Sequence, residues 1–423
     1  MVSLSAVFVI CEPMLCGPCF IVEAQRQCKL INQEHGRSRG SRFCVRTPWS
    51  EDQSPKPEPE PEAELISQNE INFAHLLTVI ITTSPTASNP CTRLIASIVR
   101  SLGIVDGLLP CRKIIVCDGY VCGQKCNYKR GRITQDAVGA YQQYLRKLET
   151  LSSAEFVNTE LLLLETRHGF SFAVRRALEL VETRFVLVVQ HDRLITRSFD
   201  LGAVLHAFDA FPRSHGSSAV KYVAFQTRQT VAGAHQARVC SRANGKHVVF
   251  PPPLRMRRKA RAKEVARQDT STRWTAVAEG DDFKEAEDEA VISLEPLAFW
   301  YDSTHCCEAN HYREFIFQET LRREEKIADE DGSRTRLRLG DFVEDTVGHQ
   351  LLNAVKKAAT TIDGFIEAHE PYGTYLWNDA VDEVHVRHID GRKYLSPEQR
   401  VELGYSKHGP TKFEAFDASS TKA

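Results

Sequence analysis

The chain has 423 residues, of which 42% are hydrophobic, enough for one large folded domain or two small ones. Its formal net charge is −1, so no overall electrostatic attraction directs it to nucleic acid, and we expect no nucleic-acid partner. Thirteen scattered cysteines, an odd number, argue against a disulfide framework and favour a mostly reduced protein. The location of the protein is left open between the cytoplasm and a Golgi- or ER-associated site.

The first 64 residues are predicted to be a leader followed by a linker. The stretch VSLSAVFVICEPMLCGPCFIVEA is apolar, but Glu12 and Pro13 interrupt it and no basic residue precedes it. A spanning helix or a signal peptide requires a cleaner pattern, so we expect a leader without fixed structure, with membrane association through this stretch as the alternative. The following SEDQSPKPEPEPEAE alternates Pro with Glu and is typical of an extended, disordered linker. The folded part is therefore expected to begin near Leu65.

Four apolar runs alternate with three helical patterns in the next part of the chain. Continuous apolar strands that alternate with helices are typical of a parallel sheet covered on both faces. We therefore predict an α/β fold with a mostly parallel central sheet and helices on both faces. The expected strands are 76–81, 113–117, 160–165 and 185–189, and the expected helices are 91–102, 136–151 and 171–182.

Each predicted strand is followed by small or polar residues. The sequences are TTSPT after the first strand, DGY after the second, TRHG after the third and QHD after the fourth. Parallel sheets bind ligands beyond the carboxyl ends of their strands, so these residues are expected to line one cleft. Any one of them could be an ordinary turn. Together they suit a phosphorylated ligand that is rich in hydroxyl groups.

Several well-known nucleotide and hydrolase motifs are missing from the sequence. The first predicted strand is followed by TTSPTASNP, which contains neither G-x-G-x-x-G nor G-K-[ST]. This argues against a dinucleotide-binding domain, a Walker loop and a nucleotidyltransferase with a glycine-rich phosphate loop. No G-x-S-x-G elbow occurs, which disfavours an α/β-hydrolase.

Residues 255–290 are predicted to be a charged, disordered insertion. Its first part, within PPPLRMRRKARAKEVARQ, holds seven basic residues against Glu264, and its later part, EGDDFKEAEDE, holds seven acids against Lys284. Runs of like charge are most often solvated loops, and a phosphate- or lipid-binding basic stretch is the minor alternative.

The motifs TVIITTSP, IIVCDG and HGFSFAVRRALELVETRFVLVVQHD, with the later GDFVEDTVGHQLL, resemble GT-A glycosyltransferases, most closely the family 2 type. The resemblance is one of pattern and covers residues 74–195 and 295–395. It implies a nucleotide-sugar donor and a glycan, lipid or protein acceptor. It also implies a nucleotide-sugar-binding half at 65–254, an acceptor and catalytic half at 291–410, and a tail at 411–423.

The resemblance also implies where the donor binds. In the family, the acid after the second strand holds the nucleoside, and an Asp-x-Asp motif after the fourth strand holds a metal ion and the diphosphate. Here that motif is Gln190-His191-Asp192, and Gln offers only a neutral carbonyl to a hard ion such as Mn²⁺ or Mg²⁺. We expect Asp192 and His388, or alternatively His385, to hold the divalent metal, and a polar strand end without metal is the alternative. The expected donor-binding residues are Thr82, Ser84, Asp118, Arg167, His168, Gly169, Gln190, His191, Asp192 and Arg392.

The stretch EPLAFWYDSTHCCEANHYREF is the candidate acceptor side. Aromatic rings stack on pyranose rings and acids bind sugar hydroxyls, so Trp300, Tyr301, Asp302 and His305 are the expected contacts. The alternative is that these aromatic residues belong to the core.

Asp345 is the expected general base, with Glu344 as the second choice. The resemblance points to this acid pair in GDFVEDTVGHQLL, which reads as a loop followed by a helix whose Val347, Leu351 and Leu352 face the core. Acids in the first turn of a helix are also favoured by its dipole, so capping is the alternative role. The sequence therefore predicts an inverting glycosyltransferase. The alternative is a non-catalytic relative that binds a nucleotide or glycan.

Overall fold

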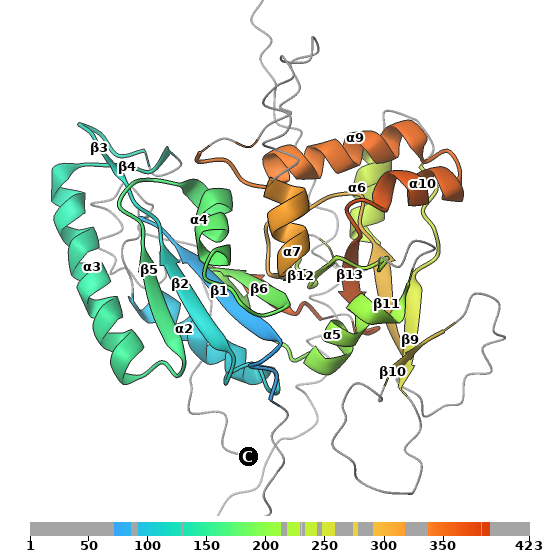
Figure 1. Cartoon of the computed structure of the whole chain (residues 1–423). Coiled ribbons are helices and arrows are strands. Elements are labelled where there is room, and N and C mark those ends of the chain that lie inside the picture. The colour runs from blue at the N-terminus through green and yellow to red at the C-terminus, as the bar shows by residue number, and fades with distance from the viewer. Residues whose placement is uncertain are drawn as a thin grey trace, which may run out of the picture. The chain divides into compact units, whose positions relative to one another are not determined.

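A large mixed β-sheet organises the protein, as Figure 1 shows for the computed structural model. The structure describes residues 72–85, 92–127, 130–212, 218–228, 230, 233–242, 248–258, 274–277, 291–317, 337, 339–381 and 383–389. The predicted leader and linker, most of the charged insertion, Arg392 and the tail lie outside these residues. No helix in the described part is long and apolar enough to cross a membrane.

One side of the sheet is parallel and matches the four predicted strands. In spatial order these are β5 (Thr159–Leu163), β2 (Arg112–Cys117), β1 (Leu77–Thr83) and β6 (Phe185–Gln190). All three neighbouring pairs are parallel. The predicted α/β class is therefore confirmed, and its physical reason is the run of buried apolar residues in each central strand.

The other side of the sheet is mixed and combines strands from distant parts of the chain. After β6 the order is β12 (His305–Glu308), β8 (Tyr222–Ala224), β13 (Thr374–Asn378), β11 (Val291–Pro296), β9 (Leu254–Arg258) and β10 (Trp274–Ala276). Strand β12 lies antiparallel to both β6 and β8, and β13 is parallel to β8 but antiparallel to β11. The two predicted halves of the chain thus share one sheet.

Two parts of the predicted insertion belong to this sheet. Residues 255–258 and 274–276 were expected in a disordered loop, but they lie in β9 and β10 at the sheet edge. The side chains of Met256 and Trp274 are buried there, and this apolar burial pairs the two strands despite the charged residues around them.

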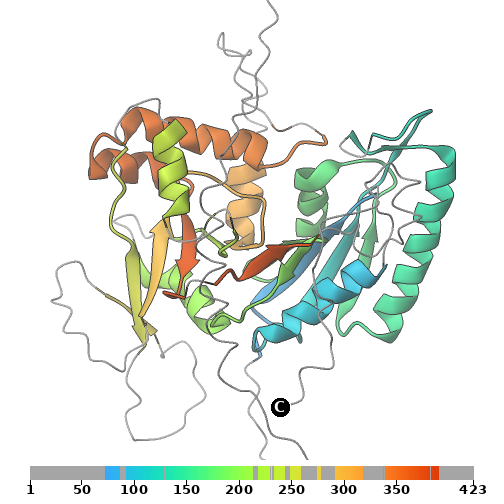
Figure 2. The same ribbon diagram turned by 180° about the vertical axis from the view of Figure 1, so that it is seen from behind.

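Helices cover both faces of the sheet (Figures 1 and 2). Side chains alternate along a strand, so Leu77, Val79 and Ile81 of β1 pack in one core while Ile80 packs in the other. The first core includes residues of α2 (Thr92–Ser101), α3 (Gln135–Ala154) and α5 (Leu201–Ala210), and the second includes residues of α4 (Gly169–Leu178).

The remaining elements surround the mixed side of the sheet and its carboxyl edge. They include a separate two-stranded sheet, in which β7 (Arg193–Ile195) pairs antiparallel with β14 (Val386–His388). These elements are α6 (Ala234–Arg242), α7 (Ala309–His311), α9 (His349–Ala358), α10 (Ile362–His369), β3 (Val121–Cys122), β4 (Arg132–Ile133), β7 (Arg193–Ile195), β14 (Val386–His388), a 3₁₀ turn (Leu102–Ile104) and π-helical turns at Tyr312–Phe317 and Glu344–Gly348.

Candidate active site

The carboxyl ends of the four parallel strands lie at one edge of the sheet, as predicted. Thr82 at the end of β1 pairs with Gln190 at the end of β6, and Thr83 pairs with Cys117 directly before Asp118. Asp118 and Asp192 therefore both follow strands that end at the same edge. This arrangement brings the predicted donor-binding segments to one side of the protein.

The Asp118 carboxylate is held by two backbone amides at the start of α4. Its Oδ1 accepts a hydrogen bond from the His168 amide at 2.7 Å, and its Oδ2 accepts one from the Gly169 amide at 2.9 Å. Burial raises the pKa of Asp118, although these amides and the nearby His168 and Arg167 oppose the effect. The carboxylate thus joins the end of β2 to the loop before α4.

Two glycines allow this loop to contact the segment that precedes the acid pair. Gly169 has φ +75° and Gly340 has φ +97°, a region that side chains rarely adopt. A Cβ on Gly169 would lie 2.3 Å from the Gly340 Cα. The Gly340 amide donates to the His168 carbonyl at 2.7 Å, and the Arg167 Nη2 donates to the Gly340 carbonyl at 3.4 Å. The loop at 166–169 therefore positions the chain that leads to Glu344.

The end of β6 connects its neighbours through the polar residues that follow the apolar run. The His191 amide donates to the Thr82 carbonyl at 2.9 Å. The Gln190 side chain donates from Nε2 to the Asp302 carbonyl at 2.8 Å. The Gln190 amide group, which replaces the first acid of Asp-x-Asp, is therefore used to bind the segment between β11 and β12. The predicted donor residue Ser84 lies just after β1 and is partly exposed.

Asp192 contacts His388, which was predicted to be the second metal ligand. The Asp192 Oδ2 lies 2.9 Å from the His388 Nε2, and the Ile389 amide donates to the Asp192 carbonyl at 2.7 Å. Burial raises the pKa of Asp192, but the His388 hydrogen bond and the charges of His191, His388 and Arg193 outweigh it, so the pKa is lowered. The other oxygen, Oδ1, is buried without a hydrogen-bond partner in the described part of the chain.

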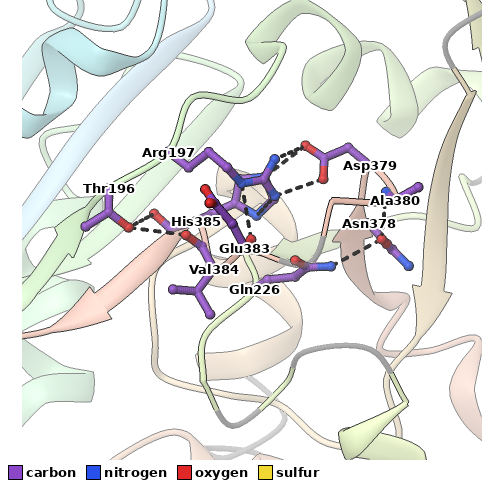
Figure 3. Close-up of polar contacts among 9 residues, drawn as sticks. All are labelled: Thr196, Arg197, Gln226, Asn378, Asp379, Ala380, Glu383, Val384 and His385. Atoms are coloured by element: carbon purple, nitrogen blue, oxygen red, sulfur yellow. Dashed lines mark hydrogen bonds and ion pairs between the residues drawn. The ribbon is translucent and has the colours of Figure 1, made fainter. Parts of the chain in front are cut away.

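A polar network anchors the segment that carries His388 (Figure 3). Arg197 donates to both oxygens of Asp379, and its Nε donates to the Glu383 carbonyl at 3.1 Å. The His385 amide donates to the Gln226 carbonyl at 3.0 Å, and the Thr196 amide donates to the His385 carbonyl at 2.8 Å. His385, the alternative metal ligand, is fully buried in this network with its ring between Arg197 and Asp379.

Asp192 and His388 are suited to a metal ion only if further ligands come from the substrate. Among the residues that the structure describes, no group of three or more His, Cys, Asp or Glu side chains could hold a metal. The Asp192 Oδ1, which has no hydrogen-bond partner among the described residues, would supply one carboxylate oxygen, and the His388 ring would supply an imidazole nitrogen. Mg²⁺ commonly uses one or two carboxylates together with substrate phosphates, so this pair fits a metal shared with a diphosphate.

The acid pair lies in the first turn of the π-helical segment that leads into α9. Asp345 is exposed and Glu344 is partly buried, while Val347, Leu351 and Leu352 are buried as the pattern predicted. Burial and the charge of Asp345 raise the pKa of Glu344, against the effect of hydrogen bonding to Asp302 and of the positive charge of Arg193.

Glu344 is bound to Asp302 by two reciprocal hydrogen bonds. The Asp302 amide donates to the Glu344 Oε2 at 3.3 Å, and the Glu344 amide donates to the Asp302 Oδ2 at 3.2 Å. Because Gln190 binds the carbonyl of the same Asp302, the acid pair and the end of β6 are joined through one residue. The predicted base and the predicted diphosphate-binding strand end are thus parts of one site.

The predicted acceptor contacts are mostly core residues. Trp300 and His305 are fully buried in the second core, so neither side chain has a surface with which to contact an acceptor. The Tyr301 hydroxyl binds His235 Nδ1 at 2.8 Å, which ties this residue to α6. The burial of Trp300 and His305 fits the alternative that the aromatic residues of this stretch belong to the core. Asp302 forms hydrogen bonds to Glu344 of the acid pair.

Two arginines near the site had no predicted role. Arg193 lies directly after Asp192, with its Nε 3.9 Å from the Asp192 Oδ1, and its position next to the predicted motif was an available signal. Arg197 pairs with Asp379, 182 positions away, and no local pattern indicates that contact.

No family model and no curated protein matches this chain. Among solved structures, TarS from S. aureus is 13% identical over 78% of this chain and 38% of its own, with a TM-score of 0.32. TarS 1–349 in complex with UDP-GlcNAc is 12% identical over 78% of this chain and 64% of its own, with a TM-score of 0.32. The mannosyltransferase PcManGT from Pyrobaculum calidifontis, in complex with GDP-Man and Mn²⁺, is 15% identical over 36% of this chain and 35% of its own, with a TM-score of 0.23. This chain spans less than two thirds of each of them. Because these TM-scores are low, we base the function on the residues of this chain.

Proposed function

We propose that this protein is a GT-A-type glycosyltransferase that moves a sugar from a nucleotide-diphosphate donor to an acceptor hydroxyl with inversion. The observation that carries the proposal is the link from Gln190 through Asp302 to Glu344. It joins the strand end that would bind a diphosphate to an exposed acid, Asp345, that could accept a proton. Such a site supplies the two groups that sugar transfer needs, one for the leaving group and one for the acceptor.

The leaving-group side is proposed to consist of Asp192, His388 and Arg193. As the glycosidic bond breaks, negative charge builds on the departing diphosphate, and positive groups placed there stabilise the transition state. A divalent ion held by Asp192 and His388 would supply such charge when bound. Arg193, whose guanidinium lies beside Asp192, would add a fixed positive charge on the same side.

Asp345 is proposed to act as the general base. Its carboxylate is exposed, and it follows Glu344, which Asp302 holds at the carboxyl edge of the sheet. Inversion results when the acceptor hydroxyl attacks the anomeric carbon from the side opposite the leaving group. The base removes the proton of that hydroxyl during the attack. Glu344 is less suited because its carboxylate already accepts the Asp302 amide.

The competing proposal is a non-catalytic relative that binds a nucleotide or glycan. Its support is Gln190, which stands in place of the first acid of Asp-x-Asp and binds backbone instead. Thermal shift with UDP, GDP and CDP, each with Mn²⁺ and with excess chelator, tests binding. Nucleoside-diphosphate release from UDP-GlcNAc and GDP-mannose, across a panel of hydroxyl acceptors, tests catalysis. Binding of a nucleotide without any release across donors and acceptors would favour the non-catalytic protein.

A further inference from the structure

Asp302 forms hydrogen bonds both to the end of β6 and to the acid pair. Its carbonyl accepts from the Gln190 Nε2 at 2.8 Å, and its amide donates to the Glu344 Oε2 at 3.3 Å. Its own Oδ2 accepts from the Glu344 amide at 3.2 Å. Three bonds to two distant segments therefore meet at a single residue.

The Asp302 side chain is only 2% exposed, and its Oδ1 is buried without a partner in the described part of the chain. Its electrostatic neighbours are the acids Glu344 and Asp345 and the hydroxyls of Tyr222 and Tyr312. None of these groups is a cation. A buried carboxylate without a cationic partner is costly, so this environment favours the neutral acid.

The pKa of Asp302 follows from this environment. Burial raises it well above its ordinary value, the charges of Glu344 and Asp345 raise it further, and the backbone hydrogen bonds at Glu344 and Val343 only partly oppose the rise. A protonated Asp302 leaves the neighbouring acid pair with less negative charge nearby than an ionised one would.

We propose that Asp302 is a positioning residue that holds the Glu344–Asp345 turn at the end of β6 and thereby aligns Asp345 with the acceptor hydroxyl. This inference rests on the proposed function, because it takes Asp345 as the base. Asp302 itself touches no reacting atom in this account. It acts by fixing the first turn of the segment that carries the base, since misplacing a base by about 1 Å can cost about 10²-fold in rate.

The test compares Asp302→Ala with Asp302→Asn, and Thr304→Val is the matched control. Thr304 is also fully buried two residues away, but its hydroxyl has no hydrogen-bond partner among the described residues. Asn can still accept the Glu344 amide, whereas Ala cannot. Amide hydrogen exchange at residues 344–347 is expected to speed up about tenfold in Asp302→Ala, in line with one lost hydrogen bond, and to change little in the other two variants. Equal exchange in all three variants would overturn the proposal.

The functional measurement is the rate of nucleoside-diphosphate release. The donor is UDP-GlcNAc or GDP-mannose, depending on which of them the unmodified protein turns over. Asp302→Ala is expected to lower kcat about 10- to 10²-fold with little change in the donor KM, and Asp302→Asn to restore most of it. A normal kcat in Asp302→Ala would overturn the proposal. If the unmodified protein turns over neither donor, the proposed function loses support, while the exchange result still decides whether Asp302 holds the turn.

Thermal unfolding against pH separates Asp302 from a merely structural residue and serves if Asp302→Ala does not fold. A carboxyl whose folded pKa is raised stabilises the fold fully below its unfolded pKa of about 4, and this contribution is lost as pH rises through the folded pKa. Asp302→Asn lacks that titration. The melting temperature of Asp302→Asn should therefore rise relative to that of the unmodified protein as the pH increases above about 4, and parallel curves would overturn the proposal.

Discussion

Arg197 and Asp379 form a two-pronged ion pair across 182 positions of sequence, with Nη1–Oδ2 and Nη2–Oδ1 distances of 2.6 and 2.8 Å. Their side chains are 16% and 21% exposed, so the pair is largely shielded from water. The pair (Figure 3) fixes the start of the chain segment that continues into β14. His388 at the end of β14 contacts Asp192. The pair is therefore a structural support for one half of the candidate site.

Asp379→Asn is expected to destabilise the fold by about 1–3 kcal/mol at neutral pH, because it leaves a shielded guanidinium without its charge partner. Burial raises the pKa of Asp379, but hydrogen bonds from His385 and Arg197 outweigh it and hold the pKa well below its usual range. A lowered pKa stabilises the fold above the unfolded value of about 4, and this stability is lost as pH falls below it. Denaturant unfolding at several pH values measures both effects.

The control for this experiment is Asp209→Asn. Asp209 forms a comparable two-pronged pair with Arg184, but those side chains are 58% and 45% exposed. Exposed pairs contribute about 0–1 kcal/mol, so this variant is expected to change stability little. A similar loss in both variants would show that burial of the Arg197 pair is unimportant.

Gly169→Ala is expected to cost about 2–4 kcal/mol of unfolding free energy, because it combines a strained backbone with a steric overlap. The residue has φ +75°, and an added Cβ would lie 2.3 Å from the Gly340 Cα. Gly139→Ala in α3 is the matched control, since a Cβ there meets nothing within 4 Å. In a helix this change should stabilise by about 0.5–1 kcal/mol. Chemical denaturation measures both, and equal values for the two variants would contradict the predicted loop contact.

Asp192→Asn is expected to abolish Mn²⁺-dependent nucleotide binding and to leave the fold intact. The amide keeps the shape of the side chain but offers a neutral oxygen, which is a poor ligand for a hard divalent ion. Isothermal titration with UDP and GDP, with Mn²⁺ or with chelator, checks the result, and Asp136→Asn in the first turn of α3 is the control. Equally tight binding by the unmodified protein in excess chelator would indicate a metal-independent site.

Asp345→Asn is expected to keep the melting temperature and donor binding and to lower turnover by about 10²–10⁴-fold, because the amide cannot accept the acceptor's proton. If Asp345 only caps its helix, the substitution would instead cost about 0.5–2 kcal/mol of stability and leave turnover largely unchanged. Asp363→Asn provides a matched control, since Asp363 is also an exposed acid in a first helical turn, that of α10. Near-normal transfer by Asp345→Asn would return Asp345 to the capping role.

The parallel side of the sheet was predictable because its signals are local. Uninterrupted apolar runs such as FVLVV indicate strands buried on both faces, and the polar residues after each run mark the edge where ligands bind. The acid pair Glu344 and Asp345 was indicated by the resemblance of GDFVEDTVGHQLL to a family motif, and the apolar period after it predicted the helix that follows. These features depend on neighbouring residues, so the sequence alone determines them.

The partners of these residues were decided by the tertiary structure. The sequence could not show that Gln190 binds Asp302, that Asp302 binds Glu344, or that Trp300 is buried in the core. Each depends on a strand order in which β12 and β13, distant in sequence, insert beside β6 and β8. Hydrogen bonds between segments 112 and 42 positions apart leave no periodic trace in the sequence, because they depend on where the folded sheet places each strand. The sequence therefore identified the acids at the edge of the sheet, and the packing of the mixed strands determined which of them are joined.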